Sequence, residues 1–593
     1  MSDYDLGEGA VPTVTYNNLP EFINGQAYTA SQTFPVALKE RVAVGNLEFY
    51  GMDTYKPMAK ATITYGMRVS WNANETSQQG LFARPAGSFR DMSHDSDQPL
   101  NEVILTGVRD LFPATPLFIY EPRVSVAYQL PLRMAVHSGF GAFSDIIPAQ
   151  IADLASGNAP YAATFVGGQF GQVGGSALAP GVPDSAVDAT QAADAQFQSL
   201  FRAGADPCTG VTPGAATCPL AVNLNTFPSG TLKTPYYFQY NLGLEKQVGA
   251  GGGLHVDFVG TRGTHEPYQV QLNGYQTVCD GCFAPYAYAQ PADQRFGNVS
   301  EFSTGANSNY AGLQTAYSQQ VAGLTLRGSY TFSHCLDEVS NGGLLSFSTQ
   351  GILSPLPGEL GRDYGNCDYD VRHNISAFGL YQIRFQSSHR WLRQVFGGWS
   401  YSETAFFHTG LPFTVLSQPY TFNGNGIIQA SGPQYAKRVP GAPLYRKTAY
   451  NGVTVAGTRQ WLNPDAFISV VDPATGACTG GDSAANCQFG NSGRNTVRGP
   501  HFADSDIYVT KTFPIHEDII FRLDAQMFNA FNHPNFALPN NVEAGVPGEP
   551  TLDIPARFGT LDSTIAPPTG LLGVGLGGDS SPRMIAFQGR IEF

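Results

Sequence analysis

The chain has 593 residues, of which only 13% are charged and 12% are aromatic, with 67 glycines and a formal net charge of -14. Soluble proteins carry about 25% charged residues, so this chain is poor in charge and rich in turn-forming and aromatic residues. The acidic balance, without any run of Lys and Arg, excludes a nucleic-acid partner, because phosphate binding depends on basic residues. No stretch of ~18 apolar residues occurs, so no membrane-spanning helix is expected.

The amino-terminal part gives few structural signals. Residues 1–10 have neither a basic start nor an apolar core, so they do not read as a secretory signal peptide. Residues 1–33 are expected to be an irregular segment. From residue 34 the sequence reads as strands, and the clearest early one is 60–72, where apolar residues occupy the odd positions and mainly polar residues the even ones.

The same alternation recurs along the rest of the chain. Paired strands are expected within 121–143, 236–258, 309–332 and 507–528, and single strands at 371–385, 399–409 and 584–593. Short turns at 130–133, 249–253, 322–323 and 513–518 join the hairpin partners. The sequence therefore predicts a series of antiparallel hairpins.

Long connections separate these hairpins. They lie near 144–234, 272–308, 335–369, 410–502 and 529–582, and the first includes a possible helix at 185–203. One short turn followed by one long loop is typical of outer-membrane barrels, with the short turns in the periplasm and the loops outside. We predict that residues 34–593 form an all-β, antiparallel transmembrane β-barrel of about 15 strands. Plugged transporters have ~22, so the count leaves open that the barrel is incomplete.

The last strand, 584–593, is apolar at Ile585, Phe587, Gly589, Ile591 and Phe593 and more polar at the positions between them. About ten residues are enough for a tilted strand to cross a bilayer. In a closed barrel this strand needs a second neighbour. Either a strand near 34–55 supplies it, or the sheet remains open.

The eight cysteines fall into neighbouring pairs in expected loops: Cys208 with Cys218, Cys279 with Cys282, Cys335 with Cys367, and Cys478 with Cys487. An even number clustered locally favours disulfides in an oxidising compartment. Cys279-Asp-Gly-Cys282 also has the spacing of a zinc site, but no second Cys or His pair lies near it in the sequence. A bridge between Cys335 and Cys367 would close the base of one loop.

Motifs of enzymes are missing. No nucleophile elbow, zincin or P-loop sequence occurs, so no catalytic site and no cofactor are expected. Asp91, His94, Asp95 and Asp97 form an acidic cluster that could bind Ca²⁺, yet its spacing departs from an EF-hand, and a solvated loop is the simpler interpretation. No metal site is predicted.

Charged residues are expected on the inward faces of several strands: Arg327, Arg372, Arg522, Asp524 and Arg590. They could contact a ligand or a plug. Salt bridges that fill a polar interior are the simpler explanation.

Several segments together resemble TonB-dependent outer-membrane receptors of the Oar-like group. These are residues 240–248, 259–265, 309–314, 329–333, 370–374, 493–500, 528–536 and 590–593, which span most of the chain from about residue 45. The resemblance implies a barrel that imports a large nutrient, is plugged by an amino-terminal domain and is energised through TonB. No plug, TonB box or carboxypeptidase-regulatory-like domain is recognisable. The chain is therefore expected to be a truncated, carboxy-terminal barrel portion.

The resemblance also implies partners. The barrel-assembly machinery would read a terminal signal made by Phe587, Ile591 and Phe593, outer-membrane lipid would surround the strands, and the TonB complex would act only with the missing amino-terminal part. The expected location is the cell outer membrane, with an unknown bulky ligand. Two other functions stay open: surface adhesion through the long loops, and a secreted β-protein whose apolar faces pack against each other.

Overall fold

The computed structural model describes the chain except for residues 1, 6–10, 17–18, 26–28, 96–97, 117, 146–150, 159, 169–184, 199–219, 222–223, 229, 274, 280–281, 286–292, 294, 297–298, 341–359, 418–433, 447–458, 469–490, 517–518, 540–557, 562–563 and 565–581. Cys208, Cys218, Cys478, Cys487 and Asp97 lie outside the described residues.

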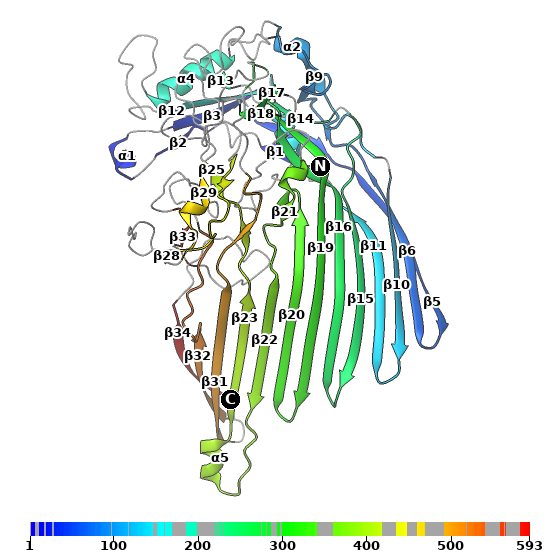
Figure 1. Ribbon diagram of the computed structural model, residues 1–593, viewed down its shortest axis with the longest axis vertical. Helices are drawn as coiled ribbons and strands as arrows, with labels where there is room; N and C mark the ends of the chain where they lie inside the picture. Colours follow the sequence, from blue (N-terminus) through cyan, green and yellow to red (C-terminus); the bar gives the residue numbers. More distant parts are fainter. Residues whose placement is uncertain are drawn as a thin grey trace.

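One curved sheet of 15 strands dominates the molecule (Figure 1). Its strands follow in the order β5 (Asn46–Met58), β6 (Ala61–Asn72), β10 (Ile119–Leu130), β11 (Met134–Ser144), β15 (Tyr236–Val248), β16 (Gly252–Gln271), β19 (Val299–Val321), β20 (Leu324–Asp337), β22 (His373–Gln382), β23 (Trp399–His408), β31 (Phe502–His516), β32 (Ile519–Phe528) and β34 (Met584–Glu592). All neighbours along this path are antiparallel. Two short strands complete the sheet: β14 (Leu224–Thr226) pairs in parallel with β19, and β21 (Gly365–Asn366) pairs with β20. The predicted all-β fold is confirmed.

The pairing of the two edge strands shows whether the sheet closes into a barrel. In the described part of the chain, β34 pairs with β32 alone and β5 pairs with β6 alone. The alternative in which a strand near 34–55 pairs with the terminal strand is therefore wrong, and the sheet is open. Every residue of β5 is exposed, as expected for an edge strand that pairs on one side only.

The sheet has two faces of different character, because successive side chains of a strand point to opposite faces and cross-strand partners share a face. One, the apolar face, carries large exposed side chains from strand after strand: Tyr65, Val124, Phe140, Tyr240, Leu313, Phe332, Ile375, Tyr401, Leu523 and Ile585. The other, the polar face, carries residues such as Arg68, Arg123, Gln239 and Gln314. An exposed apolar band of this kind fits contact with lipid.

Short turns close the hairpins at one end of the sheet, the turn end. The turn between β19 and β20 is Ala322–Gly323, and both residues have positive φ. The connection between β22 and β23 is longer and contains helix α5 (Arg390–Phe396). Within the described residues, every helix is too short or too polar to cross a bilayer.

The opposite end, the loop end, holds the smaller elements (Figure 1). Its strands are β1 (Ser2–Asp5), β2 (Thr13–Thr15), β3 (Thr29–Pro35), β4 (Lys39–Ala43), β7 (Thr76–Ser77), β8 (Phe82–Pro85), β9 (Ile104–Val108), β12 (Ala162–Gly168), β13 (Leu220–Ala221), β17 (Tyr275–Cys279), β18 (Cys282–Pro285), β24 (Pro412–Phe413), β25 (Leu416–Ser417), β26 (Gln434–Tyr435), β27 (Lys437–Arg438), β28 (Arg459–Gln460), β29 (Phe467–Ile468), β30 (Val497–Arg498) and β33 (Thr560–Leu561). Its helices are α1 (Leu19–Asn24), α2 (Leu100–Val103), α3 (Ile151–Ser156), α4 (Ala186–Gln196), η4 (Leu360–Asp363) and η5 (Pro464–Ala466).

The molecule's buried apolar core lies in this loop end. One cluster contains Phe34, Phe89 and Phe197, and another contains Phe413 and Leu462. The expectation of an irregular segment 1–33 is wrong for its described residues, because β1, β2, α1 and most of β3 lie there and β3 pairs with β12. The possible helix at 185–203 exists as α4 over part of that range, and the Oγ of its preceding Ser185 accepts a hydrogen bond from the Asp188 N–H at 3.1 Å.

Candidate functional site

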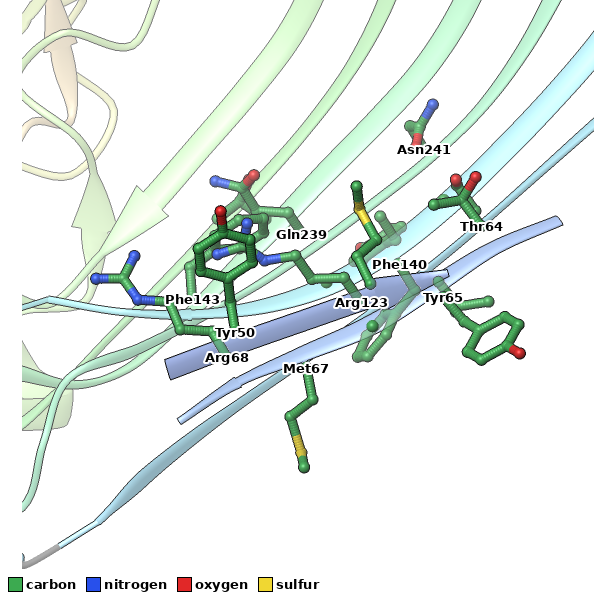
Figure 2. Close-up of a pocket in the computed structure, with 18 of the residues that line it drawn as sticks. Tyr50, Thr64, Tyr65, Met67, Arg68, Arg123, Phe140, Phe143, Gln239 and Asn241 are labelled. Carbon is green, nitrogen blue, oxygen red and sulfur yellow. The ribbon is translucent and has the colours of Figure 1, made fainter. Parts of the chain in front are cut away.

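A hollow of about 910 Å³ lies on the sheet and is lined by β5, β6, β10, β11, β15, β16 and β19. Figure 2 shows Tyr50, Arg123 and Gln239 on one side of the strands, with Tyr65 and Met67 pointing away from them. The hollow therefore belongs to the polar face. We take it as the candidate ligand site, since polar groups that converge on a concave surface are typical of binding pockets.

Glycines on the polar face leave the space that the larger side chains of the hollow occupy. A Cβ added at Gly141 would come within 2.8 Å of the Phe143 ring and 3.5 Å of Arg123. One added at Gly139 would come within 2.8 Å of the Asn241 amide oxygen. The alternation of glycine with large polar and aromatic residues thus shapes the wall.

The cationic groups of the hollow differ in their partners. Arg68 forms an ion pair with Glu48, and its Nε lies 3.3 Å from Glu121, which also accepts hydrogen bonds from Ser144. The Arg123 guanidinium lies 4.4 Å from the centre of the Phe143 ring, and no carboxylate or hydrogen-bond acceptor holds it among the described residues. Arg123 is exposed, so its N–H groups are available to an anion.

A second polar group spans three strands nearer the turn end. His137 Nε2 lies 3.0 Å from Asp257 Oδ1, and Glu245 Oε1 lies 3.6 Å from His255 Nδ1. Gly243 stands between His137 and Asp257 in the register, and a Cβ there would overlap both side chains. Within the described residues, no group of His, Cys, Asp and Glu has an arrangement suited to a metal ion.

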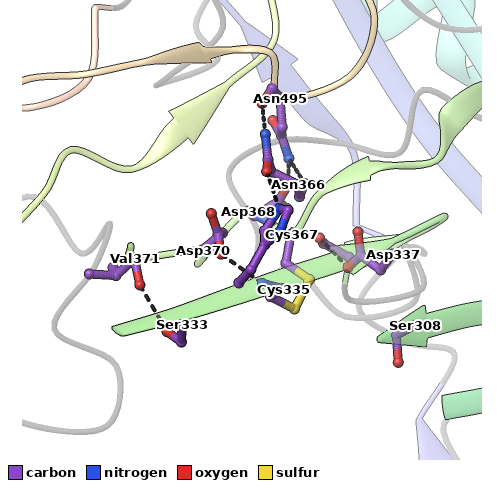
Figure 3. The surroundings of a disulfide bond; sticks show 12 residues. Ser308, Ser333, Cys335, Asp337, Asn366, Cys367, Asp368, Asp370, Val371 and Asn495 are labelled. Carbon is purple, nitrogen blue, oxygen red and sulfur yellow. Dashed lines mark hydrogen bonds between the residues drawn. A yellow bond between two sulfur atoms is a disulfide. The ribbon is translucent and has the colours of Figure 1, made fainter. Parts of the chain in front are cut away.

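The loop end carries a buried polar network around a disulfide (Figure 3). Cys335 and Cys367 are bonded, which confirms that predicted pair, and the Cys335 N–H donates to Asp370 Oδ1 at 2.7 Å. Arg494 forms an ion pair with Asp337 and lies 3.6 Å from Asp368. The network thus joins the loop that follows β20 to the loop that follows β23.

The two segments 370–374 and 493–500, which the resemblance singled out separately, meet here. Arg498 forms an ion pair with Asp370 and donates to the Asp370 and Gly410 carbonyl oxygens at 3.0 and 3.2 Å. The Asn495 amide nitrogen donates to the Asn366 carbonyl oxygen at 2.7 Å. These residues have structural roles that reasoning from the sequence missed, because their partners are distant along the chain.

Asp363 lies at the edge of this network. It is 2% exposed and accepts a hydrogen bond from the Tyr435 hydroxyl. Burial raises the pKa of Asp363 to about 7, although the Tyr435 hydrogen bond and the nearby arginines act in the opposite direction. A carboxyl group that stays protonated at mildly acidic pH therefore lies between two long loops.

His94, a member of the acidic cluster predicted from the sequence, lies beside a buried ion pair. Arg295, which is 2% exposed, forms a 2.7 Å ion pair with Asp293 and donates to the Ser93 and Gln98 carbonyl oxygens at 2.6 and 2.7 Å. His94 Nδ1 lies 3.2 Å from Asp293 Oδ2. The loop is thus fixed by a buried arginine that the sequence did not indicate.

The other residues predicted from the sequence occupy separate places. Arg522 and Asp524 form a 2.8 Å ion pair on β32, and Arg590 lies across from Arg522 on β34. Arg372 lies just before β22, with its Nε 3.4 Å from Asp370. Arg327 shares a face with Ser318 and Phe378.

A lumen role for these residues stays a prediction. So does the terminal signal, where Phe587, Ile591 and Phe593 are exposed by 82, 58 and 98%. Cys279 on β17 is the register partner of Cys282 on β18. The structure describes the backbone of these two residues and not their side chains. Reasoning from the sequence also missed Arg123, which alternates with apolar Val124 and so lies on the polar face.

A comparison with protein families matches residues 5–569 to the outer membrane beta barrel domain. The chain belongs to this family. It is therefore an outer-membrane β-barrel protein, located in the cell outer membrane. A comparison with curated proteins gave no match.

Solved structures similar to this β-barrel protein include two transporters and one receptor. They are the copper transporter OprC (TM-score 0.35, 8% identity, 96% of this chain and 50% of that one), a mutant of the ferric enterobactin receptor PfeA from Pseudomonas aeruginosa (0.37, 9%, 95% and 58%), and the unliganded ferric citrate transporter FecA (0.34, 11%, 93% and 46%). The chain spans about half the length of these solved structures.

Proposed function

We propose that this outer-membrane β-barrel protein belongs to a TonB-dependent receptor of the Oar-like kind, and that it binds a bulky anionic nutrient on the polar face of its sheet. The observation that carries the proposal is the hollow around Arg123, whose guanidinium has no anionic partner among the described residues while neighbouring Arg68 is paired. An unpaired guanidinium beside aromatic rings suits a carboxylate or phosphate on a ligand.

The size of the hollow supports a ligand larger than a simple ion. Its volume of about 910 Å³ is near the upper end of the ~300–1,000 Å³ of common ligand sites. Tyr50, Phe143 and Gln239 offer aromatic faces and an amide around Arg123. Energised transport through the TonB complex would require an amino-terminal plug region acting together with this sheet.

The unpaired edges support a second part of the proposal, that this chain works as part of a larger barrel. In hydrocarbon each unsatisfied backbone group costs several kcal/mol, so β5 and β34 need neighbours in a membrane. We expect the chain by itself to lack heat-modifiable migration in gels, and to gain it when the missing strands are supplied in the same polypeptide. Heat-modifiable migration of the chain alone would contradict this.

Ligand binding is tested with a charge reversal in the hollow. Purified protein is incubated with a panel of bulky anions (ferric citrate, a catecholate chelate of iron and inositol hexakisphosphate), and binding is measured by calorimetry. Arg123→Glu should weaken binding of the preferred anion at least tenfold, since it replaces attraction by repulsion. Arg109→Glu, an exposed change at the loop end, is the matched control and should leave binding unchanged.

The alternative of surface adhesion predicts a different result. If the variant Arg123→Glu binds every anion like the wild type, and removal of residues 437–446 from the loop end abolishes attachment of cells to a matrix, the loops and not the hollow carry the function. Binding that is lost in Arg123→Glu and retained in the loop deletion favours the receptor.

A further inference from the structure

The connection between β22 and β23 is unusual for the turn end of the sheet. Other hairpins close there with tight turns, such as Ala322–Gly323, whereas this connection runs over residues 383–398 and contains α5. Figure 1 shows α5 beyond the lower ends of β22 and β23, at the opposite end from the long loops. Hairpin closure does not need a helix.

The helix separates apolar from polar side chains around its axis. At ~100° per residue, its apolar residues share one side and its polar residues the other. The apolar side holds Trp391, Leu392, Val395 and Phe396, and the polar side holds Arg390, Arg393 and Gln394. Trp391, Val395 and Phe396 are 62, 52 and 51% exposed, so among the described residues nothing covers most of this apolar surface.

The charge of this connection is opposite to that of the chain. Residues 383–400 contain three arginines, Arg384, Arg390 and Arg393, together with His389 and no acidic residue, whereas the whole chain carries -14. All four side chains are exposed. The turn end thus presents a local cluster of cations beside an apolar surface.

Specific contacts fix the helix to the apolar face of the sheet. The Trp399 indole N–H donates to the Val395 carbonyl oxygen at 2.8 Å, and the Lys511 ammonium donates to the Val395 carbonyl at 3.3 Å and also to the Gly397 carbonyl. Lys511 lies across from Trp399 on the same face as exposed Leu523. A cation at the carboxyl end of a helix is favourable, so Lys511 holds α5 in place.

The helix therefore continues the surface that faces lipid. Tyr381 and Tyr401, which are 46 and 40% exposed, lie opposite each other on β22 and β23 close to the turn end, where aromatic side chains favour the membrane interface. The apolar side of α5 extends this aromatic band. An isolated helix of this length would not be stable in water. The contacts of α5 with Trp399 and Lys511 of the sheet therefore stabilise its helical conformation.

We propose that α5 is an interfacial anchor that binds the phospholipid leaflet at the turn end. Its apolar side, led by Trp391 and Phe396, enters the boundary between headgroups and acyl chains, and Arg390 and Arg393 bind the phosphates of anionic headgroups. The anchor fixes the height of the sheet in the membrane and the tilt of β22 and β23. It does not depend on ligand binding in the hollow.

The test uses the full chain in vesicles of phosphatidylethanolamine and phosphatidylglycerol at 3:1, some of whose acyl chains carry bromine, which quenches tryptophan. The emission of Trp391 is obtained by subtracting the fluorescence spectrum of Trp391→Phe from that of the wild type. Arg390→Glu combined with Arg393→Glu is the test variant. Arg109→Glu combined with Arg459→Glu, two exposed changes at the loop end, is the matched control.

We expect Trp391 emission to be blue-shifted and quenched by bromine in the wild type and in the control. Removing two attractive arginines at the surface should shift the equilibrium from inserted to detached helix by roughly 30-fold, so quenching should be largely lost in the test variant. Unquenched, water-like Trp391 emission in the wild type would overturn the proposal, and so would cross-linking that pairs α5 with α5 of a second copy.

A lipid exchange keeps the test informative if the charge-reversal variant fails to fold. The wild type is placed in vesicles of phosphatidylcholine alone and then in vesicles that contain phosphatidylglycerol. Stronger quenching of Trp391 with the anionic lipid supports binding through the arginines. Equal quenching in both contradicts the proposed role of Arg390 and Arg393.

Discussion

Replacing Arg494 with methionine tests whether one buried ion pair holds two long loops together. The Arg494 side chain is 10% exposed and that of its partner Asp337 is 3% exposed. Arg494 also donates to the Asp363 carbonyl oxygen at 2.7 Å and to the Ser340 hydroxyl at 3.2 Å. The substitution keeps an unbranched apolar stem as far as the position of Nε but leaves a buried carboxylate without its cation.

The expected cost follows from this burial. Breaking a buried ion pair by removing one partner costs about 3–5 kcal/mol, because the remaining charge stays desolvated. Arg446→Met is the matched control, since its pair with Asp465 has an N···O distance of 3.5 Å and side chains that are 32 and 57% exposed. Exposed pairs contribute about 0–1 kcal/mol, so the control should be nearly neutral.

The assay is native-state proteolysis of the loop end with chymotrypsin; each substitution adds one methionine, a minor cleavage site of this protease, so the test and control variants are matched in this respect. The free energy of local opening is obtained from the cleavage rate of the folded protein relative to that of the unfolded chain. A double-mutant cycle with Asp337→Asn isolates the pair, because neutralising Asp337 should recover part of the loss. If Arg494→Met opens the loops no more than Arg446→Met, the reasoning from burial is wrong.

Three further predictions concern the same loop end. Serine at both Cys335 and Cys367 should lower its stability by about 3.7 kcal/mol, because the bridge closes a loop with a separation of 32 residues; chymotrypsin protection measures this, and unchanged protection would contradict it. Burial raises the pKa of Asp363 from its ordinary 3.8 to about 7, so the contribution of Asp363 to the resistance of the loops to proteolysis is fully present below pH 4 and is lost as the pH rises through 7. Asp363→Asn should remove this pH dependence, and a variant that keeps it would exclude Asp363 as its source. A Cβ at Gly410 would overlap the Gly499 carbonyl, so Gly410→Ala should cost about 1–3 kcal/mol in thermal unfolding, and a melting temperature equal to that of the wild type would contradict this overlap.

The strands of the sheet could be predicted from the sequence because their signal is local. Residues 236–244 carry an apolar side chain at every second position, a run of glycines follows at 249–253, and β15 has the predicted bounds. Strand ends at the loop end were less predictable: β19 begins at Val299, ten residues before the expected start, because its first residues pair with β16 beyond a register shift. Alternation weakens where a strand enters the folded loops, so the sequence carries less information there.

The contacts between loops could not be predicted for a different reason. Arg494 and Asp337 are 157 residues apart, and nothing in the pattern around either residue indicates the other. Only the Cys335–Cys367 pair gave a long-range clue, since a disulfide restricts which segments can meet. Arg123 had a predictable face, but its lack of a partner depends on where every neighbouring carboxylate lies.

The two edge strands of the sheet, β5 and β34, run in the same direction. β5 enters the turn that leads to β6, and β34 ends at the same end of the sheet after leaving the loop end, so both run toward the turn end. Joining them directly would create a parallel pair in a sheet whose path is antiparallel throughout. An antiparallel closure therefore requires an odd number of additional strands, the outermost two of which both run toward the loop end. Any polypeptide that completes this barrel must start its first strand and finish its last one on opposite sides of the membrane.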